Sequence, residues 1–86
     1  MPEISRFYGI IIRMYYGDHE PPHFHIKYEN YEAKISIADL KMLTGHLSRR
    51  ALLHVLEWAF EHRQELFEDW ELMKNGKPPK KINPLD

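Results

Sequence analysis

Apolar and polar residues alternate strictly along two neighbouring segments in the first half of the chain. In residues 23–28 the apolar positions are Phe24, Ile26 and Tyr28. Residues 31–37 continue the alternation with Tyr31, Ala33, Ile35 and Ile37. In a β-strand every second side chain lies on the same face, so an alternation with a period of two is typical of a strand. The pattern therefore predicts two strands, each with one buried face.

Only Glu29 and Asn30 separate these two predicted strands, a spacing typical of a two-residue β-hairpin. Such a hairpin sets the register and places apolar residues opposite one another on the buried face, because register and face are coupled. On the other face it predicts three polar pairs, which are His23 with Ser36, His25 with Lys34, and Lys27 with Glu32.

The segments on either side of this hairpin predict further strands. Residues 7–16, "FYGIIIRMYY", are rich in β-branched and aromatic residues and favour a strand. Pro21 and Pro22 exclude helix from the loop at residues 17–22. A turn over residues 38–41 precedes a short fourth strand over residues 42–46.

From Arg49 to Lys74 the apolar residues recur with the period of a helix. Ser48 is a candidate N-cap and Gly76 a candidate C-terminal stop. An unbroken helix of this length would measure about 39 Å, which is long for so small a protein. We therefore expect either one helix or two, with a break near residues 62–63. The proline-rich basic tail, residues 75–86, is expected to lie extended along the body or to be mobile.

These elements predict an α+β fold, in which a three- or four-stranded antiparallel sheet precedes one long or broken helix packed on its apolar face. With 86 residues we expect a single domain, with the sheet over residues 4–47, the helix over residues 49–74 and the tail after it. The chain has no cysteine, which excludes thiolate metal sites, and no long apolar run. We expect a cytoplasmic protein without a membrane segment or a secretory signal.

The net charge of −1 gives the whole chain no attraction for nucleic acid, but the open face of the predicted sheet is locally basic. Arg13, His23, His25, Lys27 and Lys34 project from it beside Tyr15. Cations and an aromatic ring suit single-stranded RNA, with the cations on phosphates and the ring on bases. The simpler interpretation is a polar face exposed to water.

The histidines in "GDHEPPHFH", residues 17–25, support a metal hypothesis as well. His23 and His25 are two residues apart on a strand, so both rings project from one face. His19 lies in the preceding loop and could supply a third nitrogen, with Asp18 or Glu20 adding an oxygen ligand. This mixed set suits zinc or a similar divalent ion. Ordinary surface histidines are the competing interpretation.

A metal-free hypothesis assigns acid–base catalysis to His23 and His25, since one ring can be neutral while the other is protonated near pH 7. Lys34, opposite His25, would favour the neutral base. Arg13 or Lys34 could stabilise negative charge on a phosphate that is being cleaved.

Arg49 and Arg50 occupy the first turn of the predicted helix, where the helix dipole disfavours cations. No acid lies four residues further along, at Leu53 and His54. The arginines either pair with distant acids or, together with His46, form an anion site at the helix terminus.

Motifs throughout the chain resemble a family of small prokaryotic proteins catalogued as domain of unknown function 4160. The resemblance rests on "MPEISRFYGIIIRMYYGDHEPPHFH", "AKISI", "RRALLHVLEWAFEHRQEL" and "NGKPPKKINPL". It implies a stand-alone domain, often encoded beside a second small protein in an arrangement that looks like a toxin–antitoxin pair. The family pattern falls on nine positions, which are Asp18, His19, Pro21, Pro22, His23, Phe24, His25, Arg49 and Arg50, and it assigns no activity to any of them.

The leading functional hypothesis is one component of a two-gene toxin–antitoxin-like module that acts on RNA, or on a cognate protein encoded nearby, through the histidine-rich open face. If the protein is the active member, His23 and His25 form the catalytic pair, and the phosphate-binding residues are Arg13, Lys34, Arg49 and Arg50. The alternative is a non-enzymatic binding module, either for a divalent metal held by His19, His23 and His25 or for a protein that it regulates. The sequence does not decide between an enzyme and a binding protein.

Overall fold

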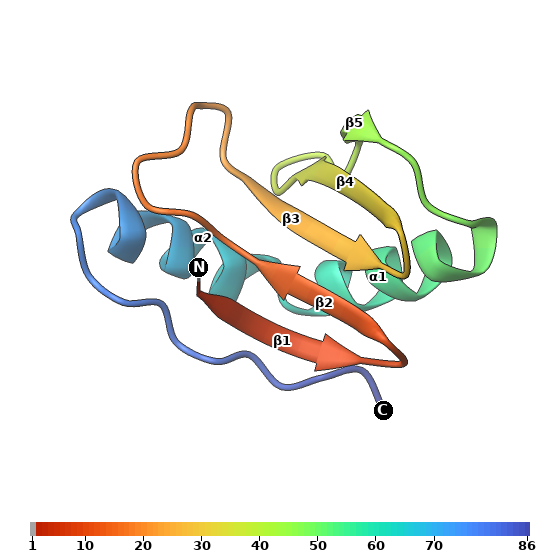
Figure 1. Ribbon diagram of the computed structural model, residues 1–86. Helices are drawn as coiled ribbons and strands as arrows, with labels where there is room; N and C mark the ends of the chain where they lie inside the picture. Colours follow the sequence, from red (N-terminus) through yellow and green to blue (C-terminus); the bar gives the residue numbers. More distant parts are fainter. Residues whose placement is uncertain (1) are drawn as a thin grey trace.

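The computed structural model describes residues 2–86 as a five-stranded sheet followed by two helices (Figure 1). The elements are β1 (Glu3–Phe7), β2 (Ile10–Arg13), β3 (His23–Tyr28), β4 (Tyr31–Ser36), β5 (Met42–Gly45), α1 (Arg49–Glu61) and α2 (Arg63–Lys74). All neighbouring strands are antiparallel and follow the order of the sequence. Both helices lie behind the sheet in Figure 1. The predicted α+β class and antiparallel sheet are confirmed.

The predicted number of strands, three or four, is wrong because the first predicted strand is a hairpin. The chain turns at Tyr8 and Gly9, whose φ angles are 52° and 77°. This turn pairs Phe7 with Ile10 and makes residues 3–7 a strand of their own. The apolar pattern continues through the turn, and a tyrosine in the left-handed region is uncommon. The sequence therefore shows neither a break in the apolar pattern nor a typical turn residue at Tyr8.

The hairpin between β3 and β4 has the predicted register along its whole length. His23 pairs with Ser36, His25 with Lys34, and Tyr28 with Tyr31. Glu29, the first turn residue, has a φ of 55°, as a tight two-residue hairpin requires. The register also extends to β2, where Arg13 lies opposite His25. A row of basic residues therefore crosses three strands.

The helical segment is broken, so of the two alternatives the single long helix is wrong. Ser48 caps α1 as predicted, because its Oγ accepts a hydrogen bond from the Ala51 amide at 3.2 Å. The helix leaves α geometry at His62, where φ is −113° and ψ is 21°. An unbroken helix of about 39 Å would exceed the longest dimension of the backbone, which is 33 Å. The break lets α2 remain packed on the sheet.

Apolar side chains from the sheet and both helices form one buried cluster. Its fully enclosed members include Ile12, Phe24, Ile35, Val55 and Trp58. The rings of Phe24 and Trp58 meet edge to face with centroids 6.1 Å apart. These contacts hold the two helices against the apolar face that the alternating pattern predicts.

The tail after α2 is extended and packs along the body, which is one of the two expected arrangements (Figure 1). The Ile82 amide donates to the Ile4 carbonyl at 2.8 Å, and the Ile82 side chain is 3% exposed. The Trp58 Nε1–H donates to the Asn83 carbonyl at 2.8 Å. The tail thus covers the free edge of β1 and part of the core.

Within residues 2–86, neither helix has the length and apolar character needed to cross a membrane.

Candidate metal centre

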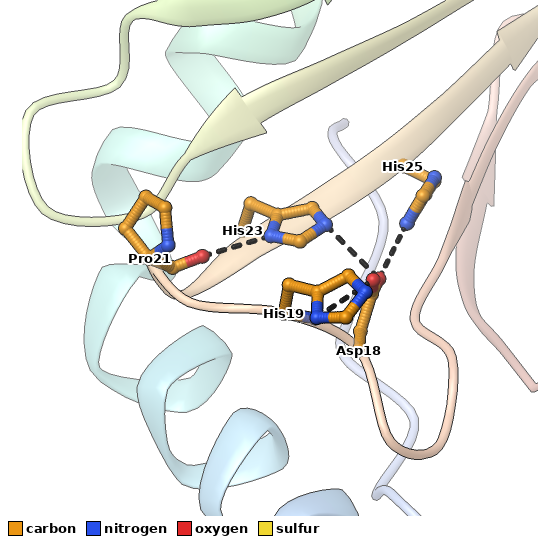
Figure 2. Close-up of polar contacts among 5 residues, drawn as sticks. All are labelled: Asp18, His19, Pro21, His23 and His25. Carbon is orange, nitrogen blue, oxygen red and sulfur yellow. Dashed lines mark hydrogen bonds and ion pairs between the residues drawn. The ribbon is translucent and has the colours of Figure 1, made fainter.

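The loop between β2 and β3 brings Asp18 against the first residues of β3 (Figure 2). Asp18 Oδ2 lies 3.0 Å from His23 Nε2 and 2.8 Å from His25 Nε2. The two imidazole rings project from the same side of β3, with centroids 5.0 Å apart. One ligand atom from each of the three residues lies within 4.8 Å of the other two. Among residues 2–86 this is the one group of three or more histidine and acidic side chains with such spacing.

A backbone carbonyl determines the tautomer of His23. His23 Nδ1 lies 2.8 Å from the Pro21 carbonyl oxygen, and because a carbonyl only accepts, Nδ1 carries the proton and donates it (Figure 2). When the ring is neutral, the lone pair of Nε2 therefore points toward Asp18, and when Nε2 also carries a proton the two residues form an ion pair. Nε2 is buried and makes no hydrogen bond despite its short distance to the carboxylate. The His23 side chain is only 5% exposed.

His25 differs from His23 because it forms a true hydrogen bond with Asp18. Its Nε2 lies 2.8 Å from Oδ2 and donates, since an ionised carboxylate can only accept. Burial of the ring is the largest influence on the pKa of His25 and lowers it. The charges of His23 and Lys34 lower this pKa further, whereas the Asp18 carboxylate opposes the change. The lowered pKa favours the neutral imidazole, which is the metal-binding form.

The pKa of Asp18 is lowered as well, which keeps it ionised. Burial of the carboxyl group, the largest single influence, would raise the pKa. The hydrogen bonds from His25 and from the His19 amide, together with the charges of both cluster histidines, outweigh that effect. The site therefore combines one carboxylate with two imidazoles in a partly desolvated pocket.

Two aromatic side chains limit the access of water to the cluster. Tyr15 meets the His25 ring edge to face at a centroid distance of 4.3 Å. Trp70, on α2, packs against the His23 ring with centroids 5.3 Å apart. Low solvent access strengthens the interaction of the donor atoms with any bound cation.

Of the three predicted metal ligands, His19, His23 and His25, the structure brings together only the last two. The His19 side chain is exposed, and its ring nitrogens do not belong to the group of mutually close donor atoms. The His19 backbone amide instead donates to Asp18 Oδ1 at 3.0 Å and helps to orient that carboxylate. Asp18, which the sequence offered only as an added oxygen ligand, takes the place next to the two histidines.

The predicted phosphate-binding residues fall into two separate groups. Arg13 and Lys34 lie on either side of His25 in the cross-strand row. Arg50 lines a hollow with Tyr8, Tyr28 and His54 at the far end of β3. Since β3 runs from His23 to Tyr28, that hollow is about 17 Å from the start of the strand. Arg49, the neighbour of Arg50 at the start of α1, is also exposed.

Comparison with protein-family models matches residues 9–71 to a family described as "Domain of unknown function (DUF4160)". The matched segment contains Asp18, His23, His25 and Trp70. The comparisons with curated proteins and with solved structures found no match.

Proposed function

Since the chain belongs to the DUF4160 family, whose description assigns no activity, we propose its function from the geometry of its site. We propose that the protein binds a divalent transition metal, zinc first among them, through His23, His25 and Asp18. The ligand atoms are the Nε2 atoms of the two histidines and Oδ2 of the carboxylate.

The observation that carries this proposal is the buried, unbonded Nε2 of His23. In the neutral ring a lone pair faces a carboxylate oxygen at 3.0 Å, and this contact needs a positive charge between the two atoms, which either a proton or a bound cation supplies. A divalent cation would satisfy both atoms. The Pro21 carbonyl that holds Nδ1–H is the kind of outer partner that metal-binding histidines generally have.

The spacing of the ligand atoms also suits a small transition metal. Bonds of about 2.0 Å at tetrahedral angles place ligand atoms about 3.3 Å apart. The separations of 3.0 and 2.8 Å from Asp18 Oδ2 are a few tenths of an ångström shorter. The side chain of Asp18, on a loop, can move by this amount. Two imidazoles and one carboxylate favour zinc or iron over magnesium and calcium, which prefer all-oxygen sites.

Three protein ligands leave at least one coordination position open, as in catalytic rather than structural zinc sites. A metal held in this way supplies Lewis acidity and lowers the pKa of bound water. The chain's own contribution is to hold the tautomer of His23, orient Asp18 through the His19 amide and restrict water by means of Tyr15 and Trp70, while His25 would give up its Nε2 proton to bind the metal.

Metal analysis of protein purified without an affinity tag tests this proposal. We expect one equivalent of zinc per chain by elemental analysis and by titration calorimetry. His23→Gln and Asp18→Asn should each abolish stoichiometric binding, whereas His19→Ala, a matched control in the same loop, should retain it. Circular dichroism verifies that each variant is folded. Stoichiometric binding that survives in His23→Gln would overturn the proposal.

A second candidate function is suggested by the basic row of Arg13, His25 and Lys34 on the open face. We propose for it the role of one component of a toxin–antitoxin-like pair, acting on RNA or on a cognate protein through that face. If the chain is the toxin and acts on RNA, induced expression in the absence of the partner gene should cause growth arrest and RNA decay, and Arg13→Gln with Lys34→Gln should relieve both. Normal growth and stable RNA would exclude a toxin role.

A further inference from the structure

A cavity of about 310 Å³ lies next to the proposed metal ligands. Its lining includes Tyr15, Asp18, Trp70, Met73 and Lys74. Its volume is at the small end of the range for small-molecule sites. The side chains that line it come from the β2–β3 loop region and from the last turns of α2, which lie far apart in the sequence.

The cavity and the metal centre share one ligand and two aromatic walls. Asp18 belongs to both. Tyr15 lines the cavity and also contacts the His25 ring at 4.3 Å between centroids. Trp70 lines it and also contacts the His23 ring at 5.3 Å. A molecule in the cavity would therefore lie beside Asp18 and could reach a metal held by that carboxylate.

The lining combines an apolar body with one cation, Lys74, and two carboxylates, Asp18 and Glu20. Tyr15, Trp70 and Met73 offer two aromatic rings and a thioether, which suit a flat apolar group. Lys74 Nζ is 3.9 Å from Glu20 Oε2, and both side chains are about three-fifths exposed. Such a long, exposed ion pair contributes little stability, so Lys74 is available to another anion.

Charge decides which kind of group should approach the metal. A divalent ion held by two neutral imidazoles and one carboxylate retains a net charge of about +1. A ligand oxygen that carries negative charge is therefore favoured over a neutral one. Lys74 at the same cavity adds a second attraction for an anion, which the neighbouring carboxylate of Glu20 partly offsets.

We propose that this cavity binds a small organic anion, with its carboxylate or phosphate-type group on the metal and near Lys74, and with its flat apolar body between Tyr15, Trp70 and Met73. The inference rests on the proposed metal function, since the metal supplies the main contact for the anion. The metal proposal alone does not specify which ligand binds beside the metal, and this inference specifies the class of that ligand.

Cobalt(II) provides the test, because its visible absorption reports changes in coordination. The full chain is loaded with Co²⁺ and titrated with phenylphosphonate, which carries both an anionic head and a flat ring. Inorganic phosphate supplies the head alone, and benzamide the ring without the charge. We expect phenylphosphonate to change the spectrum and to bind about tenfold more tightly than phosphate. Benzamide should leave the spectrum unchanged.

Two variants test the lining. Lys74→Gln should weaken phenylphosphonate binding several-fold while leaving Co²⁺ affinity unchanged, and Lys77→Gln, an exposed lysine outside this cavity, is its control. Tyr15→Ala should remove most of the preference for phenylphosphonate over phosphate.

The outcomes separate the two proposals. Failure of the wild-type chain to bind Co²⁺ would overturn the metal function and this inference together. Binding of Co²⁺ with a spectrum that phenylphosphonate does not alter would overturn only the ligand inference. Equal affinity for phosphate and phenylphosphonate, or full affinity in Lys74→Gln, would also overturn it, because the cavity lining would then play no part.

Discussion

The imidazole of His23 packs against the indole of Trp70, with ring centroids 5.3 Å apart and an interplanar angle of 50°. Trp70 is 6% exposed and His23 is 4% exposed, so the last helix encloses the first residue of β3. A histidine that the strand pattern places toward solvent is thereby held in a desolvated environment. Its Nε2 lies inside the site without a hydrogen bond.

The buried Nε2 without a hydrogen bond predicts that His23 serves metal binding more than folding. Leu at position 23 would keep an apolar contact with Trp70 and lose the hydrogen bond to the Pro21 carbonyl, a loss of about 1 kcal/mol. In EDTA we expect His23→Leu to have a free energy of unfolding within about 1 kcal/mol of the wild type. With zinc at about a hundredfold excess over Kd, the wild type should gain about 2.7 kcal/mol and the variant nothing.

Urea unfolding with and without zinc measures both quantities. A loss of several kcal/mol by His23→Leu in EDTA would assign His23 a mainly structural role. An equal zinc-dependent gain in both proteins would place the metal elsewhere.

Gly45 is predicted to be indispensable to the attachment of β5. Its φ is 91°, and a Cβ atom there would lie 2.1 Å from the Glu32 carbonyl oxygen, on the neighbouring strand. The clash involves backbone, which cannot move without breaking the β4–β5 ladder. We expect Gly45→Ala to lower the free energy of unfolding by about 3 kcal/mol or more.

Gly17→Ala is the matched control, because Gly17 has a φ of 66° but no atom within 4 Å of the position that a Cβ atom would occupy. It should show only the left-handed strain of about 1–2 kcal/mol. Thermal or urea unfolding compares the two variants, and an equal loss in both would contradict the steric explanation.

The tail is predicted to contribute to stability as part of the core. Ile82→Ala removes a side chain that is 3% exposed and should lower the free energy of unfolding by about 2–4 kcal/mol. Pro84→Ala, at an exposed position two residues further along, should stay within about 0.5 kcal/mol of the wild type. Urea unfolding measures both. A negligible effect of Ile82→Ala would show that the tail is not docked in solution.

The buried carboxyl group of Asp69 should make the free energy of unfolding depend on pH, independently of the candidate site. Its Oδ1 accepts the Lys80 amide hydrogen bond at 2.8 Å, while its Oδ2 is buried without a partner. Burial raises the pKa of Asp69 above its ordinary 3.8, with the charges of Glu65 and Glu68 reinforcing the change and Lys80 opposing it. The folded state therefore holds this proton more tightly than the unfolded state does.

The contribution of Asp69 is consequently most favourable in acid and is lost as pH rises from the unfolded-state pKa through the raised folded-state pKa. Asp69→Asn keeps an oxygen acceptor for Lys80 and cannot ionise. We expect the stability of this variant relative to the wild type to increase between pH 4 and pH 7. Urea unfolding at the two pH values provides the comparison, and a pH-independent difference would show that Asp69 titrates normally in the fold.

Local patterns in the sequence were sufficient for the parts of the fold that depend on near neighbours. The two-residue spacing at Glu29 and Asn30 determined the β3–β4 register, because a hairpin that tight allows few alternatives. Ser48 marked the start of α1 through its own side-chain hydrogen bond. The turn at Tyr8 escaped detection because its φ of 52° is adopted by a residue with no sequence preference for that region.

The candidate site likewise has one part that follows from local sequence and another that depends on the tertiary structure. The sequence by itself determined that His23 and His25 share one side of a strand, since alternation is a property of the strand alone, and their ring centroids lie 5.0 Å apart. Only the tertiary structure decided that Asp18 rather than His19 joins them and that Trp70 encloses His23. The path of a loop and the packing of a helix some 47 residues away depend on how the whole core closes, and no local pattern encodes that closure.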